Sequence, residues 1–299
     1  MNSSDFSSRL HQYPDLARFV KLFRQYIETK YFVTDKPIFI NRTPGRLDLM
    51  GGNDDYTGGM VLEKTIREAT FVAIQPRNDR LVRFNNPAVN SLGWSDLVVF
   101  SLDDLLVDGK LKEISEMRNW VNSDSKRSWC AYIVGDLYLL MQNFPPKVTH
   151  GFDLLLDSDI PIGKGVSSSA ALEVASLKAM AAMFAINAAG VELATWTQWV
   201  EIVLTQSACG IMDQMAVILG DEDIFVPMIC QPSKVLPGIK LPDSMCVWGV
   251  DSGVRHAVSG IEYEAARAAA FMGYRYLCEI ENLNPRLDES GALPRWVEP

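Results

Sequence analysis

A glycine- and serine-rich segment between an apolar strand and an alanine-rich helix most constrains how this chain folds. The segment, residues 161–171, reads PIGKGVSSSAA. It follows the short apolar run Phe152–Leu156 and leads into Ala170–Ile186, which is rich in Ala, Leu and Met. Those three residues favour helix strongly, whereas Gly and Pro interrupt regular structure. The pattern predicts a strand, a tight loop and a long helix in direct succession.

The loop has the composition of an anion-binding site. Glycines let backbone N–H groups approach an anion, the helix start adds partial positive charge, and serines add hydroxyl donors. The alternative is that the serines only cap the helix and the glycines only make a turn. The loop lacks the GxxxxGK[ST] pattern, and Ser168 replaces the third glycine of GxGxxG. The candidate phosphate-binding residues are Gly163, Lys164, Gly165, Val166, Ser167, Ser168 and Ser169.

The rest of the chain mixes helix and strand patterns without regular βαβ alternation, so we predict an α+β fold. We place a domain boundary near Pro242, giving domains of residues 1–242 and 243–299. Helical spacing covers residues 15–31, 127–142, 192–204 and 260–280. Strand patterns cover residues 38–40, 60–62, 69–75, 81–84, 224–228 and 246–250, with polar turns between those of the first third.

Composition excludes several classes of protein. The 299 residues carry a formal net charge of −9 with a pI near 4.9, which disfavours partners such as nucleic acid or anionic membranes. The five cysteines are scattered and form no CxxC pair, so neither a disulfide framework nor a zinc site is indicated. With no signal-peptide pattern and no long apolar stretch, we expect a cytoplasmic protein.

Two further segments accompany the loop: TPGRLDLMGGNDDYTGG at residues 43–59 and CGIMDQMAVILG at residues 209–220. The three motifs together resemble the GHMP kinases of the galactokinase type, over about residues 37–277. The patterns GKGVSSSAA, CGxMDQM, ICQP and WGxDSGxRH resemble the L-arabinokinase branch in particular. The resemblance implies the GHMP kinase fold, with an S5-like N-terminal domain and an incomplete ferredoxin-like C-terminal domain. It also implies ATP with Mg²⁺ and a galactose-like monosaccharide as the partners.

The same resemblance assigns roles to single residues. Asp213 matches the family's catalytic aspartate, although an Asp before an apolar helix is often only an N-cap. Arg46 matches an arginine that keeps this aspartate ionised and offsets charge in the transition state, and a loop salt bridge is the alternative. Ser168 and Glu201 match the Mg²⁺ ligands of related kinases.

The sugar contacts implied by the resemblance are Asn53, Asp55, Gly210 and Tyr263, although the run around Asp55 could equally form a solvated turn. Galactokinases carry a glutamate that binds the C6 hydroxyl where this chain has Gly52. L-Arabinopyranose is galactopyranose without the C6 group, so L-arabinose is the expected substrate and galactose the alternative.

Two departures from the family pattern favour a competing hypothesis. The segment before Cys209 lacks the family's glycine, and the third glycine-rich motif of the C-terminal domain is absent. An incomplete domain predicts apolar faces that a second copy or a further segment would cover. The competing hypothesis is a catalytically weak, sugar-binding regulatory protein on a kinase scaffold, although the motif residues favour an enzyme.

Overall fold

The computed structural model describes residues 14–207, 209–230, 233–253, 261–283, 286–287 and 294–295. The chain forms two compact units. Unit 1 takes its described residues from Met1–Thr43, Glu68–Ile160 and Ala171–Ala188, and unit 2 from Pro44–Arg67, Pro161–Ala170 and Ala189–Pro299. The two units interleave along the sequence, so each is described by itself.

Unit 1 contains a mixed sheet in the order β2-β7-β3-β4. Its strands are β2 (Met60–Pro76), β7 (Phe152–Ser158), β3 (Leu81–Asn85) and β4 (Leu97–Ser101). The β2–β7 and β3–β4 pairs are antiparallel, whereas β3 and β7 are parallel. The register places Thr70 opposite Ser158, and their hydroxyls lie 2.9 Å apart. The central strand β7 is buried on both faces, with Leu154–Leu156 in the core and the buried Asp153 paired with Arg83.

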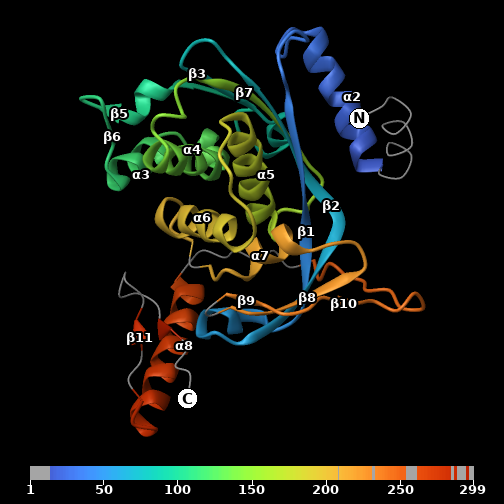
Figure 1. The fold of residues 1–299 in the computed structure, drawn as a ribbon, viewed down its shortest axis with the longest axis vertical. Helices are drawn as coiled ribbons and strands as arrows, with labels where there is room; N and C mark the ends of the chain where they lie inside the picture. The colour runs from blue at the N-terminus through green and yellow to red at the C-terminus, as the bar shows by residue number, and fades with distance from the viewer. Residues whose placement is uncertain are drawn as a thin grey trace. The chain divides into compact units, whose positions relative to one another are not determined.

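Helix α2 (Pro14–Glu28) covers one face of the unit 1 sheet (Figure 1). Its Phe19 stacks on Phe71 of β2 with 4.9 Å between the ring centroids. Phe19, Phe71 and Leu155 belong to one buried apolar cluster. At the cluster's margin Arg18 pairs with Asp157 of β7 at 2.9 Å. The apolar stripe of α2 therefore fixes the helix on the sheet, and the ion pair lies at its edge.

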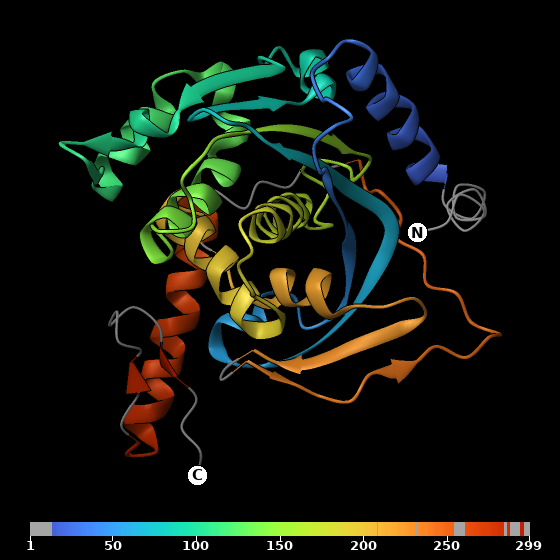
Figure 2. The same cartoon turned by 45° about the horizontal axis from the view of Figure 1, so that its top comes forward.

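Figure 2 shows α4 (Ala131–Asn143) and α5 (Ser168–Met183) on the opposite face of this sheet. Phe84 lies between Phe100 and Phe152, at centroid distances of 5.4 and 6.0 Å. Smaller elements complete the unit: η2 (Pro87–Leu92), η3 (Leu102–Leu105), β5 (Leu106–Val107), β6 (Lys110–Leu111), α3 (Ile114–Asn122) and η4 (Ser125–Cys130).

Unit 2 is built on β8 (Ile224–Ile229), which pairs antiparallel with residues 60–64 of β2. Its core cluster joins Met212 and Met215 to Val61, Val226 and Met228. The remaining elements are β1 (Phe39–Met50), η1 (Gly52–Thr57), α6 (Gly190–Val203), α7 (Met212–Leu219), β9 (Lys234–Val235), β10 (Ile239–Lys240), α8 (Ile261–Ile280), β11 (Arg286–Leu287) and β12 (Pro294–Arg295).

The mixed α+β fold class is confirmed, and three strand predictions need correction. Residues 43–50 continue β1 instead of forming a loop, and residues 63–68 continue β2 instead of forming a turn. Alternation explains β2, because Val61 and Glu63 are both buried on one face. Residues 246–250 form no strand. The boundary near Pro242 stays a prediction. No helix in the described part of the chain is long and apolar enough to cross a membrane.

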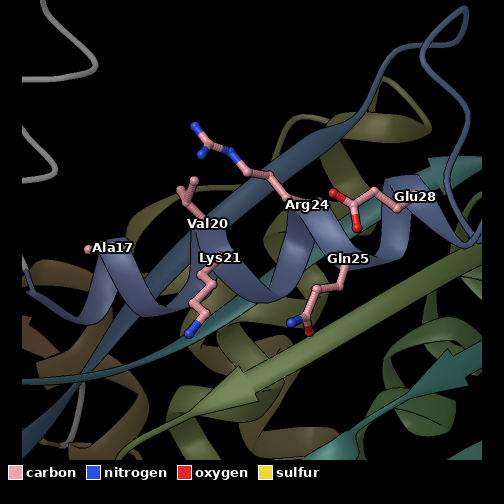
Figure 3. Close-up of a pocket in the computed structure, with 6 residues that line it drawn as sticks. All are labelled: Ala17, Val20, Lys21, Arg24, Gln25 and Glu28. Atoms are coloured by element: carbon pink, nitrogen blue, oxygen red, sulfur yellow. The ribbon is translucent and has the colours of Figure 1, made fainter.

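A shallow groove of about 360 Å³ runs along the outer side of α2 (Figure 3). Its walls are the side chains of Ala17, Val20, Lys21, Arg24, Gln25 and Glu28. All six residues come from one helix, and none was predicted as a site residue. The groove therefore has no part in the site described below.

We expect Phe19→Ala to lower the free energy of unfolding by about 3–5 kcal/mol, because it removes a buried ring stacked on Phe71. Lys21→Ala on the exposed side of the same helix should change stability by less than about 0.5 kcal/mol. Urea denaturation followed by circular dichroism measures both. Equal effects of the two substitutions would show that α2 does not pack on this sheet through Phe19.

Candidate active site

The glycine- and serine-rich loop connects β7 to α5, as the sequence predicted. Gly163 and Gly165 have φ angles of 71° and 69°, which suit glycine, and Ser167 also has a positive φ of 59°. The Ser167 hydroxyl is buried without a hydrogen-bond partner in the described part of the chain. Helix α5 begins directly after it, at Ser168. The loop thus offers a spare hydroxyl at the start of a 16-residue helix.

Strand β1 brings Arg46 against this loop. The Arg46 backbone N–H donates to the Val166 carbonyl at 3.2 Å, and its Nη1 donates to the Gly165 carbonyl at 2.5 Å. Gly45 permits the approach, because a Cβ there would lie 2.8 Å from the Val166 oxygen. Gly45 thus allows Arg46 to bind the loop through both its backbone and its side chain.

The same guanidinium pairs with Asp213, which lies in the first turn of α7. Arg46 Nε donates to Asp213 Oδ1 at 3.0 Å, and Nη2 reaches the same oxygen at 2.5 Å. Burial opposes the charge of Arg46, but Asp213 and Glu63 outweigh it and the pKa of Arg46 is raised. The N-cap of α7 is Ile211, so Asp213 is not a helix cap. Its side chain is 27% exposed and can reach a ligand.

Glu63 of β2 is a site residue that sequence reasoning missed. Its side chain is fully buried, and its Oε2 lies 3.3 Å from Arg46 Nε. Burial raises the pKa of Glu63 to about 9, because the opposing effect of Arg46 is smaller and Asp48 and Asp213 raise it further. The available signal was alternation, since Glu63 shares the inward face of Val61. The prediction of a turn at residue 63 is wrong, because residues 63–68 continue β2.

Two predicted sugar contacts, Asp55 and Gly210, lie directly together. A Cβ on Gly210 would overlap the Asp55 carboxylate, so a larger residue there would have to displace Asp55. The Met212 N–H points to Asp55 Oδ2 at 3.4 Å, and Asp55 is buried. Asn53 shares η1 with Asp55, and Tyr263 lies on α8. The side chains of Asn53 and Tyr263 lie outside the part of the chain that the structure describes, so their predicted sugar contacts stay predictions.

Gly52 has a different environment from Gly210. Its φ is 53°, it is exposed, and nothing lies within 4 Å of where a Cβ would be. A side chain at this position would meet open space, although a positive φ disfavours residues other than glycine. The geometry therefore allows a larger residue here at a modest backbone cost.

Glu201 of α6 is almost fully buried, and Gln214 Nε2 donates to its Oε2 at 2.7 Å. Burial and then Asp213 raise the pKa of Glu201 to about 7, against hydrogen bonds from Ser169, Cys209 and Gln214 that lower it. The described residues contain no group of three or more His, Cys, Asp or Glu side chains that could hold a metal ion. A carboxylate and a hydroxyl beside phosphates nevertheless fit the donor set of Mg²⁺.

Lys164 of the loop forms an ion pair with Asp251. Its Nζ lies 3.0 Å from Asp251, and the hydrogen bond from the Gly253 N–H together with Lys164 lowers the pKa of that exposed carboxyl. A phosphate would compete with Asp251 for the ammonium. The predicted phosphate contact of Lys164 stays a prediction.

Comparison with known proteins agrees with this geometry. The model of the GHMP kinases N terminal domain matches residues 131–221, which contain the loop and Asp213. The model of the galactokinase galactose-binding signature matches residues 28–76, which contain Arg46, Glu63 and η1. The two matches cover separate parts of the chain and include both partners of the Arg46–Asp213 pair.

Similar proteins are sugar kinases by name. The chain is 34% identical to L-arabinokinase of Arabidopsis thaliana over 291 residues, which are 89% of this chain and 28% of that protein. It is 37% identical to galactokinase of Chloroflexus aggregans, over 86% of this chain and 58% of that one. A crystal structure of Lactococcus lactis galactokinase complexed with galactose superposes with a TM-score of 0.66 at 23% identity. That superposition covers 84% of this chain and 59% of the galactokinase.

The fold and the motifs are those of the GHMP kinase family. The chain belongs to the GHMP kinase family, and its matched relatives place it in the galactokinase and L-arabinokinase branch. It spans less than two thirds of the length of the two curated relatives quoted above.

We expect Gly210→Ala to lower the free energy of unfolding by about 1–3 kcal/mol, because the added methyl group overlaps Asp55. Gly273→Ala is the matched control, since its Cβ would meet nothing within 4 Å on helix α8. There alanine should be neutral or stabilise by up to about 1 kcal/mol. Thermal unfolding of both variants checks this. A Gly210→Ala protein as stable as the control would mean that Asp55 does not approach Gly210.

Proposed function

We propose that this protein is an ATP-dependent sugar 1-kinase for a galactose-like monosaccharide, with L-arabinose as the preferred substrate. The observation that carries the proposal is the Arg46–Asp213 pair held against the Gly165 carbonyl of the loop. Such a pair places a carboxylate and a cation beside a loop suited to phosphate, which is what phosphoryl transfer requires. The matched sugar kinases support the same reaction class.

In the proposed reaction the C1 hydroxyl oxygen of the sugar attacks the γ-phosphorus of ATP. The new O–P bond forms as the bond to the β,γ-bridging oxygen breaks, and ADP leaves. The C1 hydroxyl proton passes to Asp213, which acts as general base or orients the hydroxyl. The partial exposure of Asp213 beside a buried Arg46 suits this role.

The loop would hold the phosphates of ATP. Its contacts would come from the backbone of residues 163–169 and from the hydroxyls of Ser167, Ser168 and Ser169, with Lys164 as an auxiliary charge. Arg46 would offset charge that develops on the transferring group. Ser168 and Glu201 would hold Mg²⁺, which neutralises phosphate charge when bound.

For the sugar, we propose that Asp55 accepts hydroxyl hydrogen bonds, with Asn53, Gly210 and Tyr263 as further contacts. Preference for L-arabinose rests on Gly52, which offers no carboxylate for a C6 hydroxyl. Galactokinase is the second candidate, favoured by the galactose-binding signature over residues 28–76. Both candidates use the same chemistry and differ only in the C6 group.

A sugar screen tests the class of function directly. ADP release should depend on sugar when L-arabinose, D-galactose, other hexoses and uronic acids are supplied with ATP and Mg²⁺. Binding of sugar and nucleotide without ADP release would instead support the regulatory hypothesis.

Trp248 and Val250 are 83% and 92% exposed. Coverage of such apolar residues by a second copy or a further segment stays a prediction.

Asp213→Asn should lower kcat by about 10²–10⁴-fold with little change in nucleotide affinity, because the lost carboxylate acts on the sugar hydroxyl. Steady-state kinetics and calorimetric titration with a nonhydrolysable ATP analogue measure the two effects. Asp243→Asn serves as the control, since that carboxylate is 97% exposed and pairs only weakly with Lys240. Unchanged kcat in the Asp213→Asn protein would remove Asp213 from the mechanism.

L-Arabinose should have a higher kcat/KM than D-galactose. A site without a partner for the C6 hydroxyl must remove water from that group and forms no hydrogen bond to it in exchange. Gly52→Glu should shift the ratio towards galactose. Gly52→Ala separates the carboxylate from the backbone strain at φ 53°, and it should leave the ratio unchanged. A wild-type protein that prefers galactose under matched conditions would refute the argument from Gly52.

A further inference from the structure

Glu63 is a buried neighbour of Arg46 that the reaction above does not use. It lies on β2 opposite Val226 of β8, on the same face as Val61, and both valines belong to the apolar core cluster. A fully buried carboxyl in such surroundings is costly unless it is paired or neutral. Its nearest ionic partner is Arg46, whose Nε lies 3.3 Å from Oε2.

Three carboxyl groups share this single guanidinium. Asp48 on β1 and Asp213 on α7 act on Glu63 together with Arg46, and the Cys230 thiol beyond β8 also lies within their field. With every carboxyl ionised the cluster would carry an excess of negative charge in a water-poor site. The least exposed group then has most to gain from a proton, because it loses most hydration. Glu63 is fully buried, whereas Asp213 is 27% exposed.

We propose that Glu63 is a positioning residue for the phosphoryl-transfer site: a protonated carboxyl that holds the Arg46 guanidinium in place and leaves its charge to Asp213. The inference rests on the proposed function for its catalytic consequence. A neutral acid keeps Oε2 as a second oxygen 3.3 Å from Nε, beside Asp213, and so limits the rotation of the guanidinium. It does so without drawing the guanidinium away from Asp213 Oδ1, which receives both Nε and Nη2.

Burial supports the neutral state, since it raises the pKa of Glu63 to about 9 from an ordinary value of 4.5. The folded protein then binds one more proton than the unfolded chain between these two pH values. The contribution of Glu63 to stability is therefore fully present below the unfolded pKa and is lost as pH rises to the folded one. The expected slope is up to a tenfold increase in the unfolding equilibrium constant per pH unit.

Two substitutions of similar size separate positioning from charge. E63Q imitates the neutral carboxyl, so kcat should stay within about threefold of wild type. E63M removes the polar contact while filling the volume, so kcat should fall about 10–100-fold with a smaller change in KM. Burying an apolar side chain in place of a charged one is usually tolerated, so we expect E63M to fold. E192Q on the exposed start of α6 is the control and should match wild type.

Two readouts do not depend on turnover. Urea unfolding between pH 5 and pH 9 should show a shallower pH dependence for E63Q than for wild type, by up to one proton, and no such change for E192Q. Hydrogen exchange at Arg46 Nε, followed by NMR, should remain slow in E63Q and accelerate at least about tenfold in E63M, where Oε2 is lost as a second acceptor beside Asp213. A wild-type protein without sugar turnover would refute the proposed function and leave these two readouts valid.

Three results would overturn the inference. The first is an E63Q protein as impaired as E63M, which would show that the negative charge of Glu63 is needed. The second is equal pH dependence of unfolding in wild type and E63Q, which would show that Glu63 is ionised. The third is unchanged exchange at Arg46 Nε in E63M, which would show that Glu63 does not position the guanidinium.

Discussion

The pair between Arg46 and Asp213 is the interaction on which the arrangement of the candidate site depends. One guanidinium joins β1, the loop before α5 and the first turn of α7, through Gly165 and Asp213. Arg46 is buried, so its charge must be met by protein groups instead of water. The planar fork of arginine suits this task, since separate nitrogens can serve separate partners. A lysine has its three donors on a single nitrogen and lacks the fork that serves Gly165 and Asp213 from separate atoms.

Two closely packed glycines link this arrangement to the proposed sugar contacts. Gly45 lets β1 approach the Val166 carbonyl, and Gly210 lets the chain before α7 approach Asp55. Asp55 and Asp213 are far apart in the sequence, yet both depend on the segment from Gly210 to Asp213. The proposed sugar contact Asp55 and the proposed base Asp213 thus both depend on one short stretch of backbone.

The sequence predicted the strand, loop and helix around residues 152–183 because composition there is unambiguous. It also predicted the pairing partners Arg46 and Asp213, since the family resemblance named them. The burial of Glu63 was not predicted. A charged residue next to Lys64 is expected to be exposed, unless the alternation along the whole strand is taken into account. The ion pair between Lys164 and Asp251 was not predicted either. The two residues lie 87 positions apart, and no local sequence pattern connects them.

The contrast between Gly52 and Gly210 bears on how such a protein can change during evolution. At Gly210 any side chain would displace the buried Asp55 carboxylate, so substitution there disturbs a second residue. At Gly52 the space is open, and the obstacle to substitution is the positive φ alone. An Asn or Asp tolerates that conformation better than most residues and would bring a polar group to the same place. Single substitutions at Gly52 could therefore change which groups this position offers to a ligand, while the Arg46–Asp213 pair stays the same.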